Sequence, residues 1–281
     1  MVGKVREMLL CIDIGNTQTV YGLFEERPGG RELVVGKGAL DGLVEHFRVS
    51  TNPALTPDEH GLQLSQLLSM VGREGQAGIA RVSLSTTNPS VGAAVLEMVR
   101  RWYQVEPLVV GPDTVTGLEI DYGNPREVGA DRIADAVGVL DLYGGPAIVV
   151  DFGTATTFDA VSSEGTYLGG AIAPGVAISL NALYHHAAAL RQVDLHEPPS
   201  VIGKTTIQAI QSGALYGFAA MADGICRKMM GEIGEARVVG TGGICSLIAP
   251  HSMLIEAEEP WLTLHGLRLI FERSVALGAK E

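Results

Sequence analysis

The chain has 281 residues, of which 46% are hydrophobic and 19% are charged, and its formal net charge is −12. That length allows one large domain or two moderate ones, each with a core of its own. The acidic balance argues against nucleic acid as the main partner, because phosphate backbones are bound by clustered Lys and Arg. It does not exclude nucleotides, since a nest of backbone N–H groups and one metal ion can hold phosphates.

The cysteines and the hydropathy limit further which classes of protein the chain can belong to. Cys11, Cys226 and Cys245 are far apart and odd in number, which gives neither a disulfide framework nor zinc-ligand spacing. We therefore expect three small buried hydrophobic residues. No apolar run approaches the roughly 18 residues of a membrane span. The N-terminal apolar run ends at Asp13 without a small-residue cleavage site, so we expect a first strand and a cytoplasmic protein without a membrane partner.

The first half of the chain predicts strands first and strand–helix alternation later. Thr56 and Pro57 are typical of the cap and the first turn of a helix. Pro-Gly-Gly at residues 28–30 favours a hairpin. The elements expected here are strands over 8–14 and 19–25, a helix over 56–72, a strand, turn and helix over 81–103, a short strand over 105–111, and a helix over 130–142.

The second half repeats this order. Its expected elements are two strands over 146–161, a third strand with its glycine-rich turn over 165–176, helices over 177–190 and 205–234, a strand, glycine turn and helix start over 236–249, and a closing helix over 261–278. Strands alternating with helices indicate α/β layers. We therefore expect two domains, residues 1–144 and 145–281.

Two similar turns open the two halves. The sequence DIGNTQT from Asp13 aligns with DFGTATT from Asp151, which places Thr19 on Thr157. Ending a buried strand on a carboxylate is costly unless it meets a metal, a cation or a set of donors. One copy alone is most simply an Asp that caps a tight turn. Two symmetric copies favour a phosphate clamp, in which Asp13 holds Mg²⁺ through water and Thr17 and its neighbours line the phosphates.

Two further segments contain glycines near a strand or helix start. Gly240, Gly242 and Gly243 lie between a strand and a helix, where a flat ligand or a phosphate can approach the backbone, although a tight connection would use the same residues. The sequence GKTT at residues 203–206 imitates the end of a P-loop. Pro198 occupies the position of the required upstream glycine and no strand leads into the segment, so we reject a Walker A site.

A candidate reaction centre lies at the start of the helix predicted over 130–142. Asp131 and Arg132 occupy its first turn among small residues. The functional interpretation makes Asp131 a general base for a substrate hydroxyl and Arg132 an anchor for a substrate carboxylate. The structural interpretation is an Asp stabilised by the helix dipole. Spacing alone leaves both open. His185 and His186 lack a third ligand at metal spacing and are interpreted as surface or interface residues.

Taken together, these motifs resemble the type III pantothenate kinase family, within the acetate and sugar kinase, Hsp70 and actin superfamily. The matching segments follow the family order and cover nearly the whole chain. They are DIGNT (13–17), VGADR (128–132), DFGTATT (151–157), GGAIAPGV (169–176), GKTTIQAIQSG (203–213), GTGG (240–243) and LTLHGL (262–267). The segment SLSTTNPSVG (83–92) departs from the family pattern, and residues 1–7 and 27–38 look like extensions.

The resemblance implies an α/β fold of two duplicated ribonuclease H-like (actin-like ATPase) domains, with mixed β-sheets flanked by helices and a nucleotide cleft between them. Residues 1–144 would carry the first phosphate loop. Residues 145–281 would carry the second Asp-x-Gly turn and the adenosine-side glycine turn. The implied activity is ATP-dependent phosphorylation of the pantothenate 4′-hydroxyl, the first step of coenzyme A biosynthesis, by a homodimer.

The resemblance also implies roles for individual residues. Asp131 matches the catalytic base. Asp151 matches the ligand of a monovalent cation, K⁺ or NH₄⁺, and Asp13 the residue that holds Mg²⁺ through water. The segment that matches the ATP contacts is Asp13, Ile14, Gly15, Asn16, Thr17, Gln18, Thr19 and Val20, with Thr154 from the second turn. The residues that match the pantothenate contacts are Tyr122, Gly129, Ala130, Asp131, Arg132 and Thr206.

Two alternatives remain beside this interpretation. A sugar or small-acid kinase of the same superfamily would use the same motifs, although Tyr122 and Arg132 suit an acceptor with a carboxylate better than a neutral sugar. Some relatives have been described as Bvg accessory factors, which would make the chain a regulatory protein. The presence of both Asp-x-Gly turns, Asp131 and Arg132 counts against a non-catalytic member. An acidic chain without a recognition helix also argues against direct DNA binding.

Overall fold

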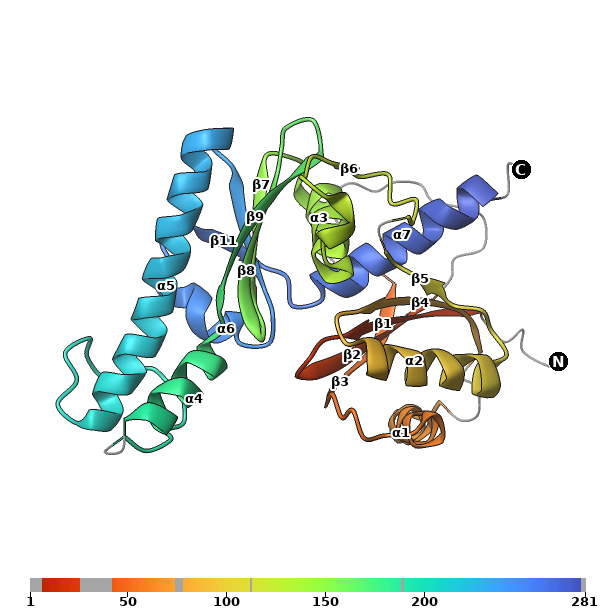
Figure 1. The fold of residues 1–281 in the computed structure, drawn as a ribbon, viewed down its shortest axis with the longest axis horizontal. Coiled ribbons are helices and arrows are strands. Elements are labelled where there is room, and N and C mark those ends of the chain that lie inside the picture. The colour runs from red at the N-terminus through yellow and green to blue at the C-terminus, as the bar shows by residue number, and fades with distance from the viewer. Residues whose placement is uncertain (1–6, 26–41, 74–77, 112, 188–189, 279–281) are drawn as a thin grey trace. The chain divides into compact units, whose positions relative to one another are not determined.

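The computed structural model of the chain describes residues 7–25, 42–73, 78–111, 113–187 and 190–278 (Figure 1). These residues form two compact units, each with its own sheet. Unit 1 draws its residues from 1–118, 123–142 and 262–281, and unit 2 from 119–122 and 143–261. The hairpin expected near residues 28–30 and most of the two extensions lie outside the described residues.

Unit 1 is built on a five-stranded mixed sheet in the order β3-β2-β1-β4-β5. The strands are β1 (Met8–Ile14), β2 (Gln18–Glu25), β3 (Leu43–Ser50), β4 (Ile79–Thr86) and β5 (Leu108–Val109). The first three form an antiparallel meander, whereas β4 and β5 run parallel to β1. Crossover helices make these parallel connections possible.

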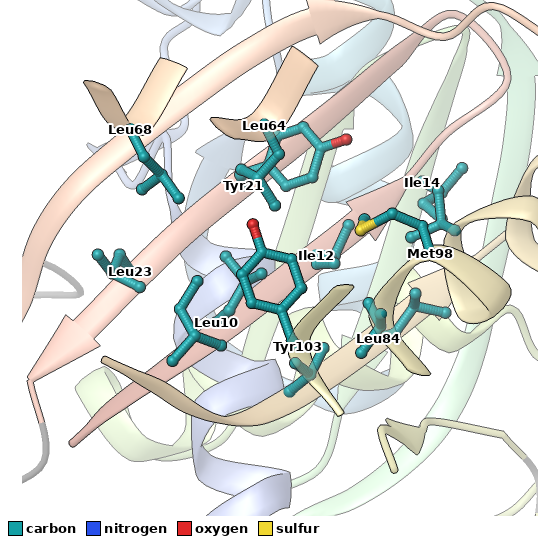
Figure 2. Packing of buried hydrophobic residues seen from close by; sticks show 14 of the residues in the cluster. Leu10, Ile12, Ile14, Tyr21, Leu23, Leu64, Leu68, Leu84, Met98 and Tyr103 are labelled. Carbon is teal, nitrogen blue, oxygen red and sulfur yellow. The ribbon is translucent and has the colours of Figure 1, made fainter. Parts of the chain in front are cut away.

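Helices α1 (Pro57–Met70) and α2 (Pro89–Met98) cover one face of this sheet, and the short helix η1 (Val99–Tyr103) follows α2. Thr56 caps α1 as expected, and it forms a capping box with Glu59, because the two residues exchange side-chain and backbone hydrogen bonds. Alternate residues of β1 pack against these helices, and Figure 2 shows the resulting core. Its labelled members are Leu10, Ile12, Ile14, Tyr21, Leu23, Leu64, Leu68, Leu84, Met98 and Tyr103.

The other face of the unit 1 sheet packs against helix α7 (Leu262–Gly278), which in turn packs against α3 (Ala130–Tyr143). The Ser83 hydroxyl donates to the Leu267 carbonyl at 3.1 Å. Gly266 lies so close to the Ala134 carbonyl that a Cβ there would overlap it. The short helix η2 (Pro125–Glu127) precedes α3.

The position of α7 differs from the expected division at residues 144 and 145, which assigned this helix to the second half. Its apolar residues Leu264 and Leu267 are buried, and Leu264 lies against Gly22 of the first sheet. The chain therefore passes from one unit to the other after residues 118, 122, 142 and 261. A linear sequence shows which residues are apolar but not which sheet they will cover.

Unit 2 repeats the strand pattern of unit 1 and adds one strand, in the order β11-β10-β7-β8-β9-β6. Its strands are β6 (Glu119–Ile120), β7 (Ala147–Phe152), β8 (Ala155–Val161), β9 (Thr166–Pro174), β10 (Arg237–Thr241) and β11 (Ile255–Glu258). Again three strands form an antiparallel meander and two run parallel to the first. This repeat confirms the predicted α/β class with duplicated mixed sheets.

Helices of unit 2 gather on one face of its sheet. They are α4 (Val176–His186), α5 (Thr206–Ile233) and α6 (Cys245–Ile248), followed by the short helix η3 (Ala249–His251). Ile148, Val150, Phe152 and Phe158 point from the strands into the core beneath them. The opposite face of β7 and β8 therefore carries Val149, Asp151, Thr157 and Asp159.

The three cysteines are small buried residues, as expected. All three cysteines are free and buried, and burial raises the pKa of Cys226 and Cys245 to about 12. Among the described residues, no helix combines the length and hydrophobicity needed to traverse a bilayer. Strands β3, β6 and β11 were not predicted: β3 is only partly buried, and β6 and β11 have two and four residues.

Candidate functional site

The first Asp-x-Gly turn joins β1 to β2 in unit 1. The Gly15 N–H donates to the Gln18 carbonyl at 3.0 Å and closes the turn. Thr51, just after β3, anchors it from outside: its hydroxyl donates to the Gly15 carbonyl at 2.8 Å and its N–H to the Thr17 carbonyl at 2.9 Å. Asn16, Thr17 and Gln18 are exposed, whereas Ile14, Thr19 and Val20 are buried. The exposed residues 16–18 are thus held in place by buried residues on either side of the turn.

Asp13 lies half-buried at the end of β1, opposite Ser85 of β4 in the strand register. The Ser85 hydroxyl donates to Asp13 Oδ1 at 2.7 Å. Burial, reinforced by repulsion from the Asp131 carboxylate, raises the pKa of Asp13 to about 7, although the Ser85 hydrogen bond opposes this rise. A carboxyl that is costly to ionise alone favours a cation beside it.

Asp131 begins the neighbouring helix α3. Its Oδ1 accepts the Arg132 N–H at 2.9 Å, as an acidic residue in a first helical turn does. A Cβ at Gly129 would crowd the Asp131 carboxylate, so a larger residue there would require that side chain to move. Arg132 is buried and Asp131 half-buried. The structure therefore brings Asp131 into the electrostatic environment of Asp13, which lies 118 residues earlier in the chain.

The residues around Asp13 fit a hydrated divalent cation. No group of three or more His, Cys, Asp or Glu suited to a metal occurs among the residues that the structure describes. Mg²⁺ does not need such a cage, since it keeps several waters and uses one or two carboxylates together with substrate phosphates. Asp13, with the Asp131 carboxylate nearby and an exposed turn beside it, supplies that kind of donor set.

The second Asp-x-Gly turn joins β7 to β8 in unit 2, and it is one residue shorter than the first. Asp151 pairs with Thr157 and Phe152 with Thr156, whereas in unit 1 Asp13 pairs with Val20 and Ile14 with Thr19. The structural counterpart of Thr19 is therefore Thr156. The alignment of Thr19 with Thr157 was wrong, because an ungapped alignment cannot register a shorter turn.

Glycines pack closely against Asp151 and its turn. Gly242, after β10, has φ +96, and a Cβ there would collide with Asp151 Oδ1 and with the Phe152 backbone. Gly175 approaches the Thr154 carbonyl in the same way. Thr154 is half-buried in the turn itself. The backbone of Gly242 thus lies close to the Asp151 carboxylate and that of Gly175 close to the turn itself, which only glycine permits.

Tyr122 and Thr206 lie elsewhere in unit 2. The Tyr122 ring is 37% exposed and packs over Gly169 of β9. Thr206 is exposed at the start of α5, one residue after the cap Thr205, whose hydroxyl accepts the Gln208 N–H. The described residues between α4 and α5 form no strand that leads into residues 203–206.

Sequence reasoning missed two residues that shape the first turn. Ser85 could have been found, because polar residues at the same end of neighbouring parallel strands lie close together. Thr51 had no such signal, since β3 was not predicted. His185 and His186 are exposed, as expected. Near β11, Glu256 and Glu258 are exposed, while Glu259 accepts the Tyr143 hydroxyl at 2.6 Å.

The family profile and the curated relatives that match this chain carry the same description. The family profile described as type III pantothenate kinase matches residues 9–228. The type III pantothenate kinase of Streptomyces griseus is 47% identical and covers 96% of this chain and 99% of its own. That of Moorella thermoacetica is also 47% identical, over 95% of this chain and 100% of its own.

Two solved structures share the fold at low identity. One is a conserved putative Baf family transcriptional activator from Campylobacter jejuni, with a TM-score of 0.56, 18% identity, and coverage of 95% of this chain and 99% of that one. The other is the activator of 2-hydroxyisocaproyl-CoA dehydratase from Clostridium difficile with bound ADPNP, with a TM-score of 0.55, 13% identity and 98% coverage of each chain. At these identities the likeness concerns the fold alone.

Proposed function

The chain belongs to the type III pantothenate kinase family, and we propose that it transfers the γ-phosphoryl group of ATP to the 4′-hydroxyl of pantothenate. This reaction is the first step of coenzyme A biosynthesis. The observation that carries the proposal for this chain is the pair of carboxylates, Asp13 and Asp131, held near each other beside an exposed glycine turn. We also propose a cytoplasmic location, with which three buried free thiols are compatible.

Phosphoryl transfer asks little covalent chemistry of a protein and depends on alignment and charge. Asp131 accepts the proton of the 4′-hydroxyl as that oxygen forms a bond to the γ-phosphorus. The bond from the γ-phosphorus to the bridging oxygen breaks, and ADP leaves. Arg132, next to Asp131, binds the pantothenate carboxylate, with Tyr122, Gly129, Ala130 and Thr206 as further substrate contacts. A first-turn position suits Asp131, because helix α3 holds its backbone rigid.

ATP is bound by the first turn, residues 13–20, and by Thr154 of the second. The exposed N–H groups and side chains of Asn16, Thr17 and Gln18 face the phosphates. Asp13 holds Mg²⁺ through water, and the bound cation supplies positive charge that stabilises the phosphates. Because the pKa of Asp13 is about 7 without a ligand, binding of Mg·ATP below that pH releases a proton.

Asp151 binds the monovalent cation, K⁺ or NH₄⁺. The close approach of the Gly242 backbone to its carboxylate supports this role, since K⁺ is bound well by several oxygens at modest separation. Such a cation adds positive charge without the rigid octahedron that Mg²⁺ demands.

A homodimer forms through an apolar surface of unit 2, which we call the α4 surface and define as Ile178, Leu183, Val201, Ile202 and Ile207. These side chains are 41–70% exposed, and α4 buries only Val176. The start of α5 lies beside α4 (Figure 1). An exposed apolar patch of this kind is typical of an interface.

Sedimentation of two variants tests this dimer. Ile202→Glu should give a monomer, whereas Met253→Glu, at a residue 84% exposed outside the α4 surface, should keep the dimer.

The decisive experiment is a coupled ADP-release assay with pantothenate and Mg·ATP in KCl, NH₄Cl or NaCl. We expect pantothenate-dependent turnover that requires the larger cations. Turnover with another small acid or a sugar, but not with pantothenate, would overturn the acceptor. Absence of turnover in every salt would overturn the enzymatic role and favour a regulatory protein.

A further inference from the structure

Asp159 is a buried carboxylate in the second sheet that the proposed phosphoryl transfer does not use. Its side chain has 0% exposure, and a carboxylate in such a place requires hydrogen-bond donors. Two hydroxyls donate to it: Tyr167 Oη to Oδ1 at 2.8 Å, and Thr157 Oγ1 to Oδ2 at 3.1 Å. Asp159 therefore links the side chains of β8 and β9 in addition to their backbone ladder.

One end of this link reaches the proposed cation site. Thr157 is the strand partner of Asp151 across the antiparallel pair β7 and β8. Paired residues project from the same face of a sheet, and residues two apart on a strand share that face. Asp151, Thr157 and Asp159 consequently project together, on the face opposite the core that holds Phe152 and Phe158.

The other end reaches Tyr122. The rings of Tyr122 and Tyr167 are 6.4 Å apart at 51°. The Asp121 N–H, in the residue before Tyr122, donates to the Tyr167 carbonyl at 2.8 Å. Gly169, with φ +102, leaves room for the Tyr122 ring, which a Cβ there would approach to 3.1 Å. Tyr167 therefore positions Tyr122 through both its ring and its backbone.

We propose that Asp159 and Tyr167 are positioning residues that couple cation binding at Asp151 to pantothenate binding at Tyr122. The inference deepens the proposed function and rests on it. A cation that orders the Asp151 turn also orders Thr157 beside it, and the hydrogen bonds that Thr157 and Tyr167 donate to Asp159 carry that order to Tyr167. Coupling between two sites is reciprocal, so the cation tightens pantothenate binding by the same factor as pantothenate tightens cation binding.

The test measures that factor by calorimetry rather than by turnover. Pantothenate is titrated into the protein with Mg²⁺ and a non-hydrolysable ATP analogue, in KCl and in NaCl of equal ionic strength. We expect a Kd ratio between the two salts of at least about fivefold in the wild type. Tyr167→Phe removes only the hydroxyl, and Asp159→Asn keeps the shape, and both should bring the ratio towards one.

Two controls separate coupling from folding and from loss of the cation site. Tyr21→Phe removes the hydroxyl of another fully buried tyrosine, one that has no hydrogen-bond partner among the described residues, and should keep the wild-type ratio. The Tm of each ligand-free protein in KCl relative to NaCl reports cation binding itself. Tyr167→Phe should keep that difference, because Asp151 and its glycines are unchanged.

The outcomes are distinct. Wild-type ratios in both Tyr167→Phe and Asp159→Asn overturn the inference. A wild-type protein that binds pantothenate equally in both salts also overturns it and leaves the proposed function intact. A wild-type protein that neither binds nor phosphorylates pantothenate overturns the proposed function, and this inference with it.

Discussion

The two Asp-x-Gly turns use the same scaffold, a hairpin at the end of a central strand, yet they place their carboxylates in different environments. Asp13 lies close to a second carboxylate, Asp131, and receives a hydroxyl from Ser85. Asp151 is approached by the backbone of Gly242 and lies in a turn one residue shorter. Two nearby carboxylates favour a divalent cation at the first turn. The backbone that lies close to Asp151 favours a larger cation at the second turn, one with less strict requirements on coordination geometry.

Removing the carboxylate that distinguishes the first turn should have the largest effect. Asp131→Asn takes away the proposed base, so we expect kcat to fall by about 10² to 10⁴-fold. The same change removes the repulsion on Asp13, whose pKa should fall below about 7. Steady-state kinetics and a carboxyl NMR titration measure the two effects. Near-normal kcat in a folded variant would contradict the role of Asp131.

Blocking the close backbone at the second turn should have the next largest effect. Gly242→Ala places a Cβ against Asp151 and the Phe152 backbone at φ +96, so we expect Tm to fall by about 4–8 °C, together with loss of the response to K⁺. Gly224→Ala, in the middle of α5 with open space around it, is the matched control and should raise Tm slightly. Calorimetry in KCl and in NaCl measures both the Tm and its response to K⁺. An unchanged response to K⁺ in Gly242→Ala would count against a cation at this turn.

Removing the Ser85 hydroxyl should have a smaller effect, through the pKa of Asp13. Ser85→Ala removes a donor to the Asp13 carboxylate, which favours the protonated form and raises its pKa further above about 7. Mg·ATP binding should then move to higher pH, by up to about one pH unit. Ser83→Ala, two residues earlier, loses only a hydrogen bond to Leu267 and should keep the wild-type pH profile. Identical profiles for both variants would show that Ser85 does not tune Asp13.

The smallest expected effect is that of Asp13→Asn on the thermal stability of the ligand-free protein. The folded pKa of Asp13, about 7, lies above its ordinary value of 3.8, so the folded state binds the proton more tightly and loses stability as pH rises between these values. Asp13→Asn has no such loss. We expect its Tm relative to wild type to be a few degrees higher at pH 8 than at pH 4. A Tm difference that does not change with pH would contradict the raised pKa.

Local signals predicted most of the fold. Thr56 with Pro57, the helical spacing of the apolar residues in α2 and the apolar run of β1 each act within a few residues, so the sequence alone identified α1, α2 and the first strand. The Asp-x-Gly pattern likewise located both turns. Strands whose identity depends on their neighbours were missed: β3 is only partly buried, and β6 and β11 pair along a few residues each.

Long-range relations could not be predicted from such signals. Asp13 and Asp131 interact only because β1 and α3 belong to one unit, and no local pattern specifies that. The buried link from Thr157 to Tyr167 passes through Asp159, which the sequence shows merely as an acidic residue within a strand. The match of Thr19 with Thr157 failed for the same reason, since strand pairing rather than residue identity sets the correspondence.

The placement of α7 in unit 1 has a consequence for how the chain is made. Synthesis on a ribosome completes β1 within the first 14 residues, but the helix that covers its outer face ends at residue 278. Until then Leu9, Cys11 and Gly22 lack the cover that Leu264 and its neighbours give them. The first sheet therefore begins to form early and is closed last, so the nascent chain exposes an apolar face throughout translation of unit 2.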